Sequence, residues 1–216
     1  MALVLRLNPA RLDLDVIGRA VDVLRQGGVA VFPTETVYGI GADIRLAAAA
    51  RRVYELKQRS AEQPLMAHVA DDEHLAGYVA EMPKLGQRLA GAFWPGPLAL
   101  VLRRGEAVPD EVVSGGRTVG VRMVAHPVAR ALIRRLGAPL AGTSANRHGE
   151  PATSRFEHID PELLAGADVA LDCGTCGAGV ASTVLDLTGD APRLVRAGAV
   201  PVEEIEAVLG SSVARG

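Results

Sequence analysis

Aromatic residues and cysteines are scarce in this sequence, and each shortage excludes a class of protein. Phe, Trp and Tyr together make up 3% of its 216 residues. Proteins that bind single-stranded nucleic acid use aromatic stacking platforms, which this composition nearly excludes, and the core must be aliphatic. Two cysteines, Cys173 and Cys176, are too few for a disulfide framework. Their scarcity favours a reducing, cytoplasmic location.

Long hydrophobic runs and an excess of positive charge are also missing. No apolar run approaches the roughly 20 residues that a membrane-spanning helix needs. The first residues meet a charge too early for a secretory signal, so no membrane contact is expected. The formal net charge is −2. Any contact with RNA would therefore require a local basic patch and is expected to be weak.

Two motifs that bind nucleotides or metals are absent or incomplete. The phosphate-binding pattern GxxxxGK[ST] does not occur, so a nucleotide would have to bind by another geometry. Cys173 and Cys176 form a single CxxC, whereas a structural zinc site needs four ligands. We therefore predict no metal site made by the protein itself and a structural role for the two thiols.

Stretches with the spacing of partly buried helices alternate with short apolar runs typical of strands. Helices are predicted at residues 12–26, 46–57, 72–80, 84–93, 127–136 and 201–209. Strands are predicted at residues 29–32, 65–70, 98–102, 118–122, 140–142, 169–172, 183–187 and 194–196. This alternation indicates an α/β protein. We predict a single domain over residues 1–216, with its core at about 13–209 and a twisted, mixed, largely parallel sheet flanked by helices.

Polar side chains gather where the predicted strands end, which is where ligands bind in open α/β sheets. The segments concerned are residues 32–43, 57–59, 142–149 and 182–198. Lys57 offers a point charge and Arg59 a planar fork, a combination that commonly holds triphosphates. Each segment, taken singly, also fits an ordinary turn or a helix end. A lone strand histidine such as His68 is more often a core residue, and a buried Arg122 would require an anionic partner.

Eight short sequences stand out in order along the chain. They are FPTETVYGIG at 32–41, KQR at 57–59 with PL at 64–65, HV at 68–69, WPGP at 94–97, VGVR at 119–122 with HP at 126–127, TSAN at 143–146, STV at 182–184 and RAG at 196–198. Taken together, they resemble the YrdC/Sua5 family of threonylcarbamoyl-AMP synthases. The resemblance covers nearly the whole chain.

The resemblance implies a concave, electropositive cavity and a reaction. L-threonine, bicarbonate and ATP would give threonylcarbamoyl-AMP and pyrophosphate, and Mg²⁺ would accompany the ATP. The product would pass to a tRNA threonylcarbamoyl transferase complex. By similarity, the catalytic residues would be Lys57 and Arg59. The ATP site would comprise Lys57, Arg59, Ser144, Asn146 and Arg196. The threonine and bicarbonate site would comprise Thr34, Tyr38, His68, Arg122, Thr143 and Ser182.

Two positions depart from the family pattern, and two other functions stay open. Gln63 stands where the family often has a second lysine, and Ser60 where it often has a proline. No extra C-terminal domain is seen, so the short YrdC type is expected. The alternatives are a double-stranded RNA-binding module and a related carbamoyl or adenylyl transfer protein. The similar domain of hydrogenase-maturation proteins belongs to much larger chains with zinc-finger-like segments, which are not seen here.

Overall fold

The computed structural model describes residues 1–58, 63–147 and 149–215. These ranges contain eleven strands: β1 (Leu3–Arg6), β2 (Ala30–Phe32), β3 (Gly39–Asp43), β4 (Met66–Val69), β5 (Leu98–Arg103), β6 (Thr118–Met123), β7 (Leu140–Ser144), β8 (Val169–Asp172), β9 (Thr183–Asp186), β10 (Arg193–Arg196) and β11 (Ala214–Arg215). The α-helices are α1 (Leu14–Arg25), α2 (Ala47–Lys57), α3 (Lys84–Phe93), α4 (Asp110–Val113), α5 (Pro127–Leu136), α6 (Pro161–Gly166) and α7 (Val202–Leu209). Short 3-10 helices lie at Asp72–Leu75 and Phe156–His158.

All these strands join one sheet in the order β1-β8-β2-β3-β7-β4-β6-β5-β9-β10-β11. The mixed character predicted from the sequence is confirmed, but the sheet is not largely parallel. Parallel pairs are β1-β8, β2-β8, β4-β6, β5-β9 and β10-β11, and the antiparallel pairs β2-β3, β3-β7, β4-β7, β5-β6 and β9-β10 are equally numerous. The reason is that several strands are joined by loops rather than by crossover helices, and such loops favour antiparallel neighbours.

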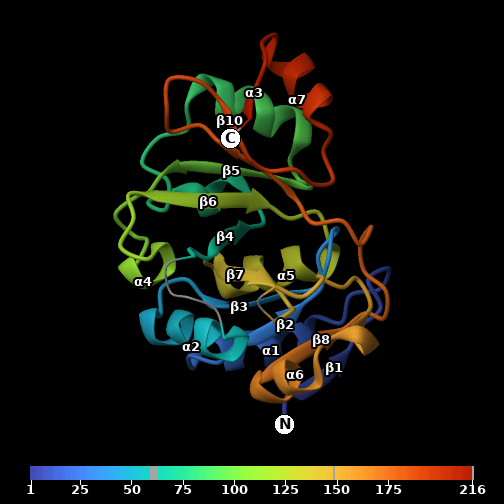
Figure 1. Ribbon diagram of the computed structural model, residues 1–216. Coiled ribbons are helices and arrows are strands. Elements are labelled where there is room, and N and C mark those ends of the chain that lie inside the picture. Colours follow the sequence, from blue (N-terminus) through green and yellow to red (C-terminus); the bar gives the residue numbers. More distant parts are fainter. Residues whose placement is uncertain (59–62, 148, 216) are drawn as a thin grey trace.

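Two hydrophobic cores lie along this sheet. The larger one packs α1, α2 and α5 against strands β1, β8, β2, β3, β7, β4 and β6. The smaller one is formed by α3 and α7 over β5 and β9, with Leu98, Leu100, Leu185 and Ile205 at its centre. Figure 1 shows α3 and α7 at the top of the molecule and the other long helices below. The cavity described in the next section lies where the two parts meet.

Local sequence explains where two helices of the larger core begin and end. α1 is capped by Asp13, whose carboxylate accepts hydrogen bonds from the backbone N–H groups of Asp15 and Val16, both at 3.1 Å. Such a cap stabilises a helix by about 1 kcal/mol. α5 begins at Pro127 and ends at Gly137, where φ is +75°. Only glycine adopts that conformation without strain.

The structure corrects two predicted elements. A helix was predicted at residues 72–80, but only a 3-10 turn over Asp72–Leu75 forms, because Gly77 takes a φ of +79° and ends it. No strand was predicted between residues 33 and 45, but Gly39–Asp43 form β3, which pairs with β2 in a hairpin. A Cβ at Gly41 would lie 2.7 Å from the Ala141 carbonyl oxygen. Gly39 and Gly41, the two glycines of residues 32–43, therefore allow β3 to pack closely.

No helix in the described ranges is long and apolar enough to cross a membrane.

Candidate active site

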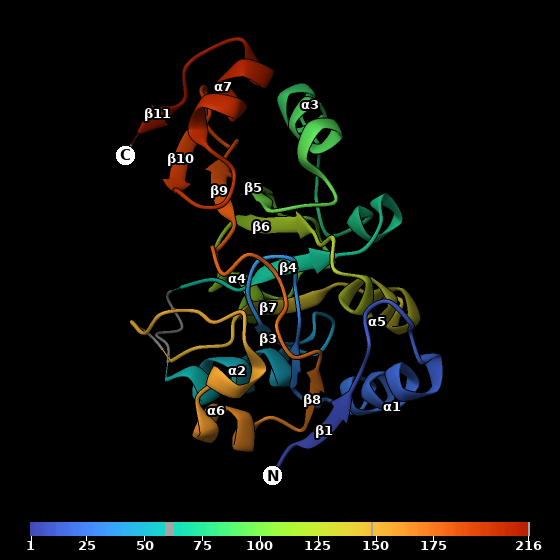
Figure 2. The same cartoon turned by 90° about the vertical axis from the view of Figure 1, so that its right-hand side faces the viewer.

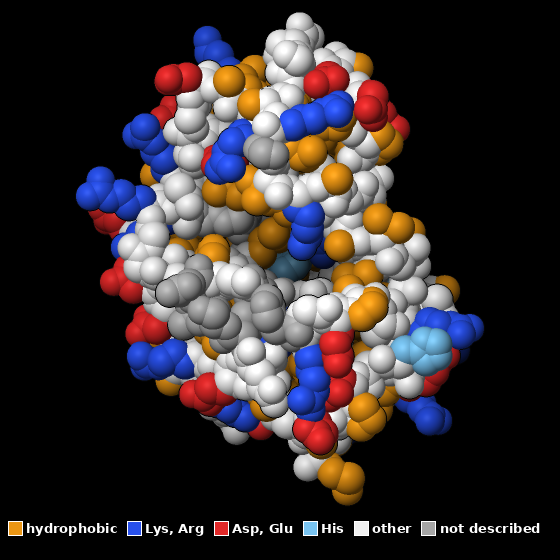
Figure 3. Space-filling view, viewed as in Figure 1, with side chains coloured by type: hydrophobic (Ala, Val, Ile, Leu, Met, Phe, Trp, Pro, Cys, Tyr) orange, Lys and Arg blue, Asp and Glu red, His pale blue; other side chains and the backbone are white. Residues whose placement is uncertain are grey.

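A cavity of about 110 Å³ lies at the junction of the two parts of the molecule. Figure 3 shows the hollow at the centre of this face, with basic side chains and a histidine at its edge and floor. Its walls come from the loop between β2 and β3, from β4, β6 and β7, and from the segment that leads into β9. The lining includes Thr34, Thr36, Tyr38, His68, Arg122, Thr143, Ser144, Ser182 and Arg196.

Most of the residues expected from the sequence line this cavity, and two of the described ones do not. All six residues expected at the threonine side are present, as are Ser144 and Arg196 from the nucleotide side. Lys57 and Asn146 lie outside the cavity lining. Arg59 lies outside the described residues.

The loop between β2 and β3 holds its threonines in one hydrogen-bonded unit. The Thr34 and Thr36 hydroxyls lie 2.8 Å apart, and the Thr34 hydroxyl donates to the Val37 carbonyl at 2.6 Å. Both threonines are about 1% exposed, so these bonds form where water does not compete. The loop therefore presents a fixed polar wall to the cavity. The sequence showed hydroxyls at this loop, but the role of Thr36 was not foreseen.

Arg122 supplies a buried positive charge to this wall. Its Nη1 donates to the Thr36 hydroxyl at 2.8 Å and lies 3.4 Å from Oε1 of Glu35. The Arg122 side chain is 4% exposed, and its Nε has no hydrogen-bond partner among the described residues. Burial lowers the pKa of Arg122, and the Glu35 carboxylate opposes this shift. A buried guanidinium that lacks one partner is suited to an anionic ligand.

His68 lies beside Arg122 because β4 and β6 run parallel with His68 opposite Arg122. Its ring packs edge-on against Phe32, with ring centroids 5.6 Å apart. Burial and the neighbouring Arg122 lower the pKa of His68 to about 3. Its Nδ1 is buried and has no hydrogen-bond partner among the described residues. His68 is therefore neutral at physiological pH and is not simply a satisfied core residue.

The opposite wall comes from the segment between β8 and β9, which we call the crossing segment (residues 173–182). Figure 2 shows it rising from the lower part of the molecule to the upper part. Its backbone binds the loop between β2 and β3 (residues 33–38), which we call the threonine loop after Thr34 and Thr36. The Ala178 and Gly179 N–H groups donate to the Glu35 and Thr36 carbonyls at 3.2 and 2.9 Å. It ends at Ser182, which lines the cavity.

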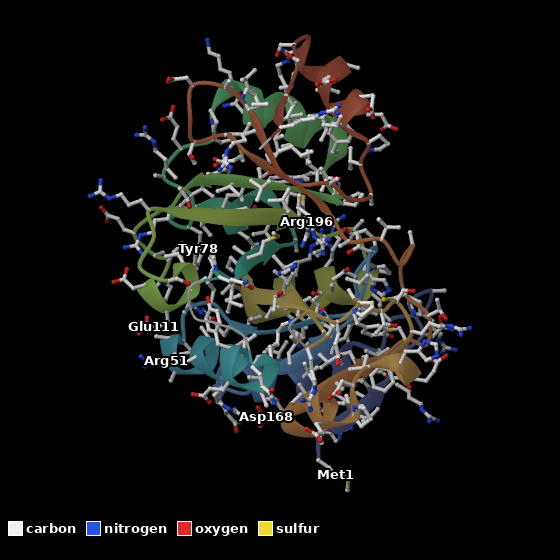
Figure 4. All side chains as sticks on the ribbon, in the orientation of Figure 1. Met1, Arg51, Tyr78, Glu111, Asp168 and Arg196 are labelled. Carbon is white, nitrogen blue, oxygen red and sulfur yellow. The ribbon has the colours of Figure 1, made fainter. Side chains whose placement is uncertain are left out.

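Arg196 is held against the end of the crossing segment. Its Nε and Nη2 donate to the Ser182 carbonyl at 3.1 and 2.8 Å, and Nη2 also donates to the Ser182 hydroxyl at 3.1 Å. Figure 4 shows Arg196 between the two parts of the molecule. The fixed guanidinium lies at the cavity wall, where it can contact a phosphate or a ribose.

Gly198 allows this contact, and its replacement should break it. A Cβ at residue 198 would lie 2.3 Å from the Ala181 carbonyl oxygen and 2.5 Å from the Ser182 carbonyl carbon. Gly198→Ala must therefore push Arg196 and the crossing segment apart. We expect a loss of about 1–3 kcal/mol in the free energy of unfolding, as for other overpacked sites, and weaker nucleotide binding.

Chemical unfolding and calorimetric titration would measure these two effects. Gly189→Ala is the matched control, because a Cβ there would approach no backbone atom closer than 4.0 Å. Equal stability and affinity in the two variants would contradict the role assigned to Gly198.

Lys57 and Asn146 lie behind the cavity rather than in its wall. Lys57 is 2% exposed, and its ammonium donates to the Ser144 carbonyl at the end of β7. The Asn146 amide donates to the carbonyls of Arg147 and Glu150 at 2.8 and 2.7 Å, so it shapes the loop after β7. In this structure Lys57 binds Ser144 and Asn146 binds Arg147 and Glu150, and the expected contacts of both residues with nucleotide stay predictions.

Tyr38 lines the cavity without pointing its hydroxyl at it. The hydroxyl donates to the Gly174 carbonyl at 3.1 Å and accepts from the Cys173 N–H at 3.0 Å. In this structure the hydroxyl anchors the start of the crossing segment, and the ligand contact expected for Tyr38 stays a prediction. Burial raises the pKa of Cys173 to about 12 and that of Cys176 to about 11, so neither is a reactive thiolate at neutral pH. Within the described ranges, no group of three or more acidic, histidine or cysteine side chains could hold a metal.

Comparisons with known proteins agree with this geometry. The family model Sua5_yciO_yrdC, described as "Telomere recombination", matches residues 22–198. The threonylcarbamoyl-AMP synthase of Pyrococcus abyssi is 42% identical over 191 residues, which are 88% of this chain and 56% of the relative. That of Bacillus subtilis is 41% identical over 195 residues, which are 90% of this chain and 56% of the relative. The chain thus spans little more than half the length of these relatives.

Solved structures give the same picture. P. abyssi Sua5 in complex with L-threonine matches with a TM-score of 0.93 and 39% identity, covering 100% of this chain and 62% of that one. E. coli YciO matches with a TM-score of 0.86 and 28% identity, covering 95% of this chain and 100% of that one. The model match, the identities and the shared fold agree, and the chain belongs to the Sua5, YciO and YrdC family.

Proposed function

We propose that this chain makes threonylcarbamoyl-AMP from L-threonine, bicarbonate and ATP and releases pyrophosphate. One observation carries the proposal. The buried Arg122 has a guanidinium nitrogen without a partner among the described residues and lines a cavity whose walls also carry hydroxyls, Arg196 and a neutral imidazole. An amino acid with a hydroxyl side chain matches this set, since its carboxylate would meet Arg122. The P. abyssi relative, whose structure holds L-threonine, supports this choice of ligand.

The reaction has two steps in this proposal. The amine nitrogen of threonine bonds to the carbon of bicarbonate, and water leaves, which gives a carbamate. A carbamate oxygen then bonds to the α-phosphorus of ATP, and the bond from that phosphorus to the bridging oxygen breaks as pyrophosphate leaves. Negative charge grows on the attacked phosphoryl group and on the leaving group, so preorganised positive charge accelerates the step.

This chain's residues divide the work between two sides of the cavity. Arg122, His68 and Ser182 bind and orient threonine. His68 stays neutral, so its unpartnered Nδ1 can accept a hydrogen bond from the ligand. Arg196 and Ser144 contact the nucleotide, and Lys57 approaches the phosphates from behind Ser144 once ATP is bound. Arg59, which follows Lys57 closely in the sequence, is proposed for the same side.

The proposal includes Mg²⁺, which ATP brings to the site. In the described part of the chain no carboxylate cluster could hold the ion, and Mg²⁺ is commonly held by substrate phosphates and water. The ion would supply charge neutralisation at the phosphates. Its protein contacts would be few.

The product is proposed to pass, in the cytoplasm, to a separate transferase complex that modifies adenosine in tRNA. Any direct contact with RNA would be weak, because the net charge of the chain is −2 and RNA affinity depends on positive charge that meets the phosphates. It would use the basic hollow lined by Arg103, Arg104 and Arg117.

The test is product identification by mass spectrometry after incubation with ATP, bicarbonate and L-threonine. We expect threonylcarbamoyl-AMP, together with pyrophosphate release that requires both threonine and bicarbonate. Omitting threonine, and separately removing dissolved CO₂, are the controls. Pyrophosphate release that ignores threonine in a bicarbonate buffer would contradict the proposal.

A further inference from the structure

Glu35 lies in the middle of the threonine loop but points away from the cavity. Its neighbours Thr34 and Thr36 face the cavity, whereas Glu35 is absent from the lining. The Glu35 carboxylate accepts a hydrogen bond from the Ala125 N–H at 2.9 Å through Oε2. The Glu35 carbonyl accepts one from Ala178 in the crossing segment at 3.2 Å. This single residue therefore connects the threonine loop, the loop after β6 and the crossing segment.

The second carboxylate oxygen of Glu35 has an electrostatic role. Oε1 is buried and makes no hydrogen bond among the described residues, yet it lies 3.4 Å from Nη1 of Arg122. The two side chains are 17% and 4% exposed, so solvent screens the contact poorly. A buried cation needs a counter-charge to keep its position. Thr36, the other partner of Nη1, is neutral and cannot supply it.

These contacts leave one part of the guanidinium for a ligand. Nη1 is occupied by Thr36 and faces Glu35, while Nε lacks a partner in the described part of the chain. Resting on the proposed function, we infer that Glu35 is a positioning residue for the amino-acid substrate: its carboxylate fixes Arg122 by the Nη1 side, so that the remaining donors meet the substrate carboxylate. Glu35 does not itself touch the substrate.

Two opposing effects decide what a change at Glu35 does. Removing its charge relieves repulsion between Glu35 and the substrate carboxylate, which would strengthen binding. It also leaves Arg122 without a counter-charge and free to turn toward other acceptors, which would weaken binding. The second effect dominates in this inference, because bidentate recognition depends on orientation and an uncompensated buried charge reorganises its surroundings.

Glu35→Gln tests the inference, because the amide keeps the size of the side chain and can still accept from Ala125. We expect the KM for threonine to rise about tenfold or more, while kcat and the KM for ATP stay within about threefold. Glu111→Gln is the matched control. It removes the carboxylate of a surface ion pair with Arg51, at 2.9 Å, and Figure 4 places both residues at the edge of the molecule, away from Arg196.

The same change in an Arg122→Ala background separates positioning from a general structural role. If Glu35 acts through Arg122, the substitution shifts the threonine KM less than about twofold there, since nothing is left to position. A structural defect would persist in both backgrounds. An unchanged or lower threonine KM in Glu35→Gln, or equal effects in both backgrounds, overturns the inference. If the wild-type protein forms no threonylcarbamoyl-AMP, the proposed function is overturned instead. The wild-type product is therefore measured before any variant is compared.

Discussion

Replacing Arg122 by alanine is expected to weaken L-threonine binding by about 30- to 150-fold, or about 2–3 kcal/mol. The ATP affinity of the free protein should change little. The guanidinium of Arg122 is buried, and its Nε has no hydrogen-bond partner among the described residues. It lies against the threonine loop and beside His68. Removing the guanidinium leaves the substrate carboxylate without its bidentate hydrogen-bond donor. Calorimetric titration with each ligand measures the two affinities separately.

Two further variants make this result specific. Arg122→Lys keeps a positive charge but loses the planar fork, so it should recover only part of the lost affinity. Arg45→Ala removes an exposed arginine whose partner is Asp43, at 2.6 Å, and should leave threonine binding within about twofold. A threonine affinity that survives in Arg122→Ala would move the carboxylate site elsewhere.

Replacing Lys57 by alanine should act on turnover instead. We expect kcat to fall on the order of a hundredfold or more, with threonine affinity nearly intact. The ammonium already lies at the end of β7, where it binds the Ser144 carbonyl. On ATP binding this charge is placed to meet the phosphoryl group as negative charge develops there. Steady-state rates, combined with threonine titration, measure the effect.

Folding must be checked for this variant, because Lys57 is 2% exposed and its loss removes a donor from the Ser144 carbonyl. Thermal unfolding serves that purpose. Lys84→Ala, at the exposed first residue of α3, is the matched control and should leave kcat unchanged within about twofold. If folded Lys57→Ala and Arg122→Ala both weaken both ligands equally, the division of the cavity into two sides is wrong.

The strands that carry the site could be predicted from the sequence, but their neighbours could not. Apolar runs of four to six residues predicted β4 and β6, with His68 in the first and Arg122 in the second. That His68 lies opposite Arg122 depends on a parallel pairing across about fifty residues of chain. Nothing in either run specifies such a register.

What the sequence could not show at the site also has physical causes. The Tyr38 hydroxyl lies between the Cys173 N–H and the Gly174 carbonyl, and both partners are distant in sequence. Glu35 was overlooked for the same reason. Its significance comes from a partner on β6 and a loop after it, and a carboxylate between two threonines carries no local signal of either.

The two sides of the cavity are held by different hydrophobic cores and therefore differ in their resistance to local unfolding. Arg122 and His68 belong to strands of the larger core, whereas Arg196 and Ser182 are fixed by the smaller core of α3, α7, β5 and β9. Small cooperative units open before the whole domain unfolds. Such an opening would release Arg196 and Ser182 from the cavity wall and leave Arg122 and His68 in place. A ligand that bridges both walls would oppose it, so substrate occupancy and the folding of the smaller core are thermodynamically linked.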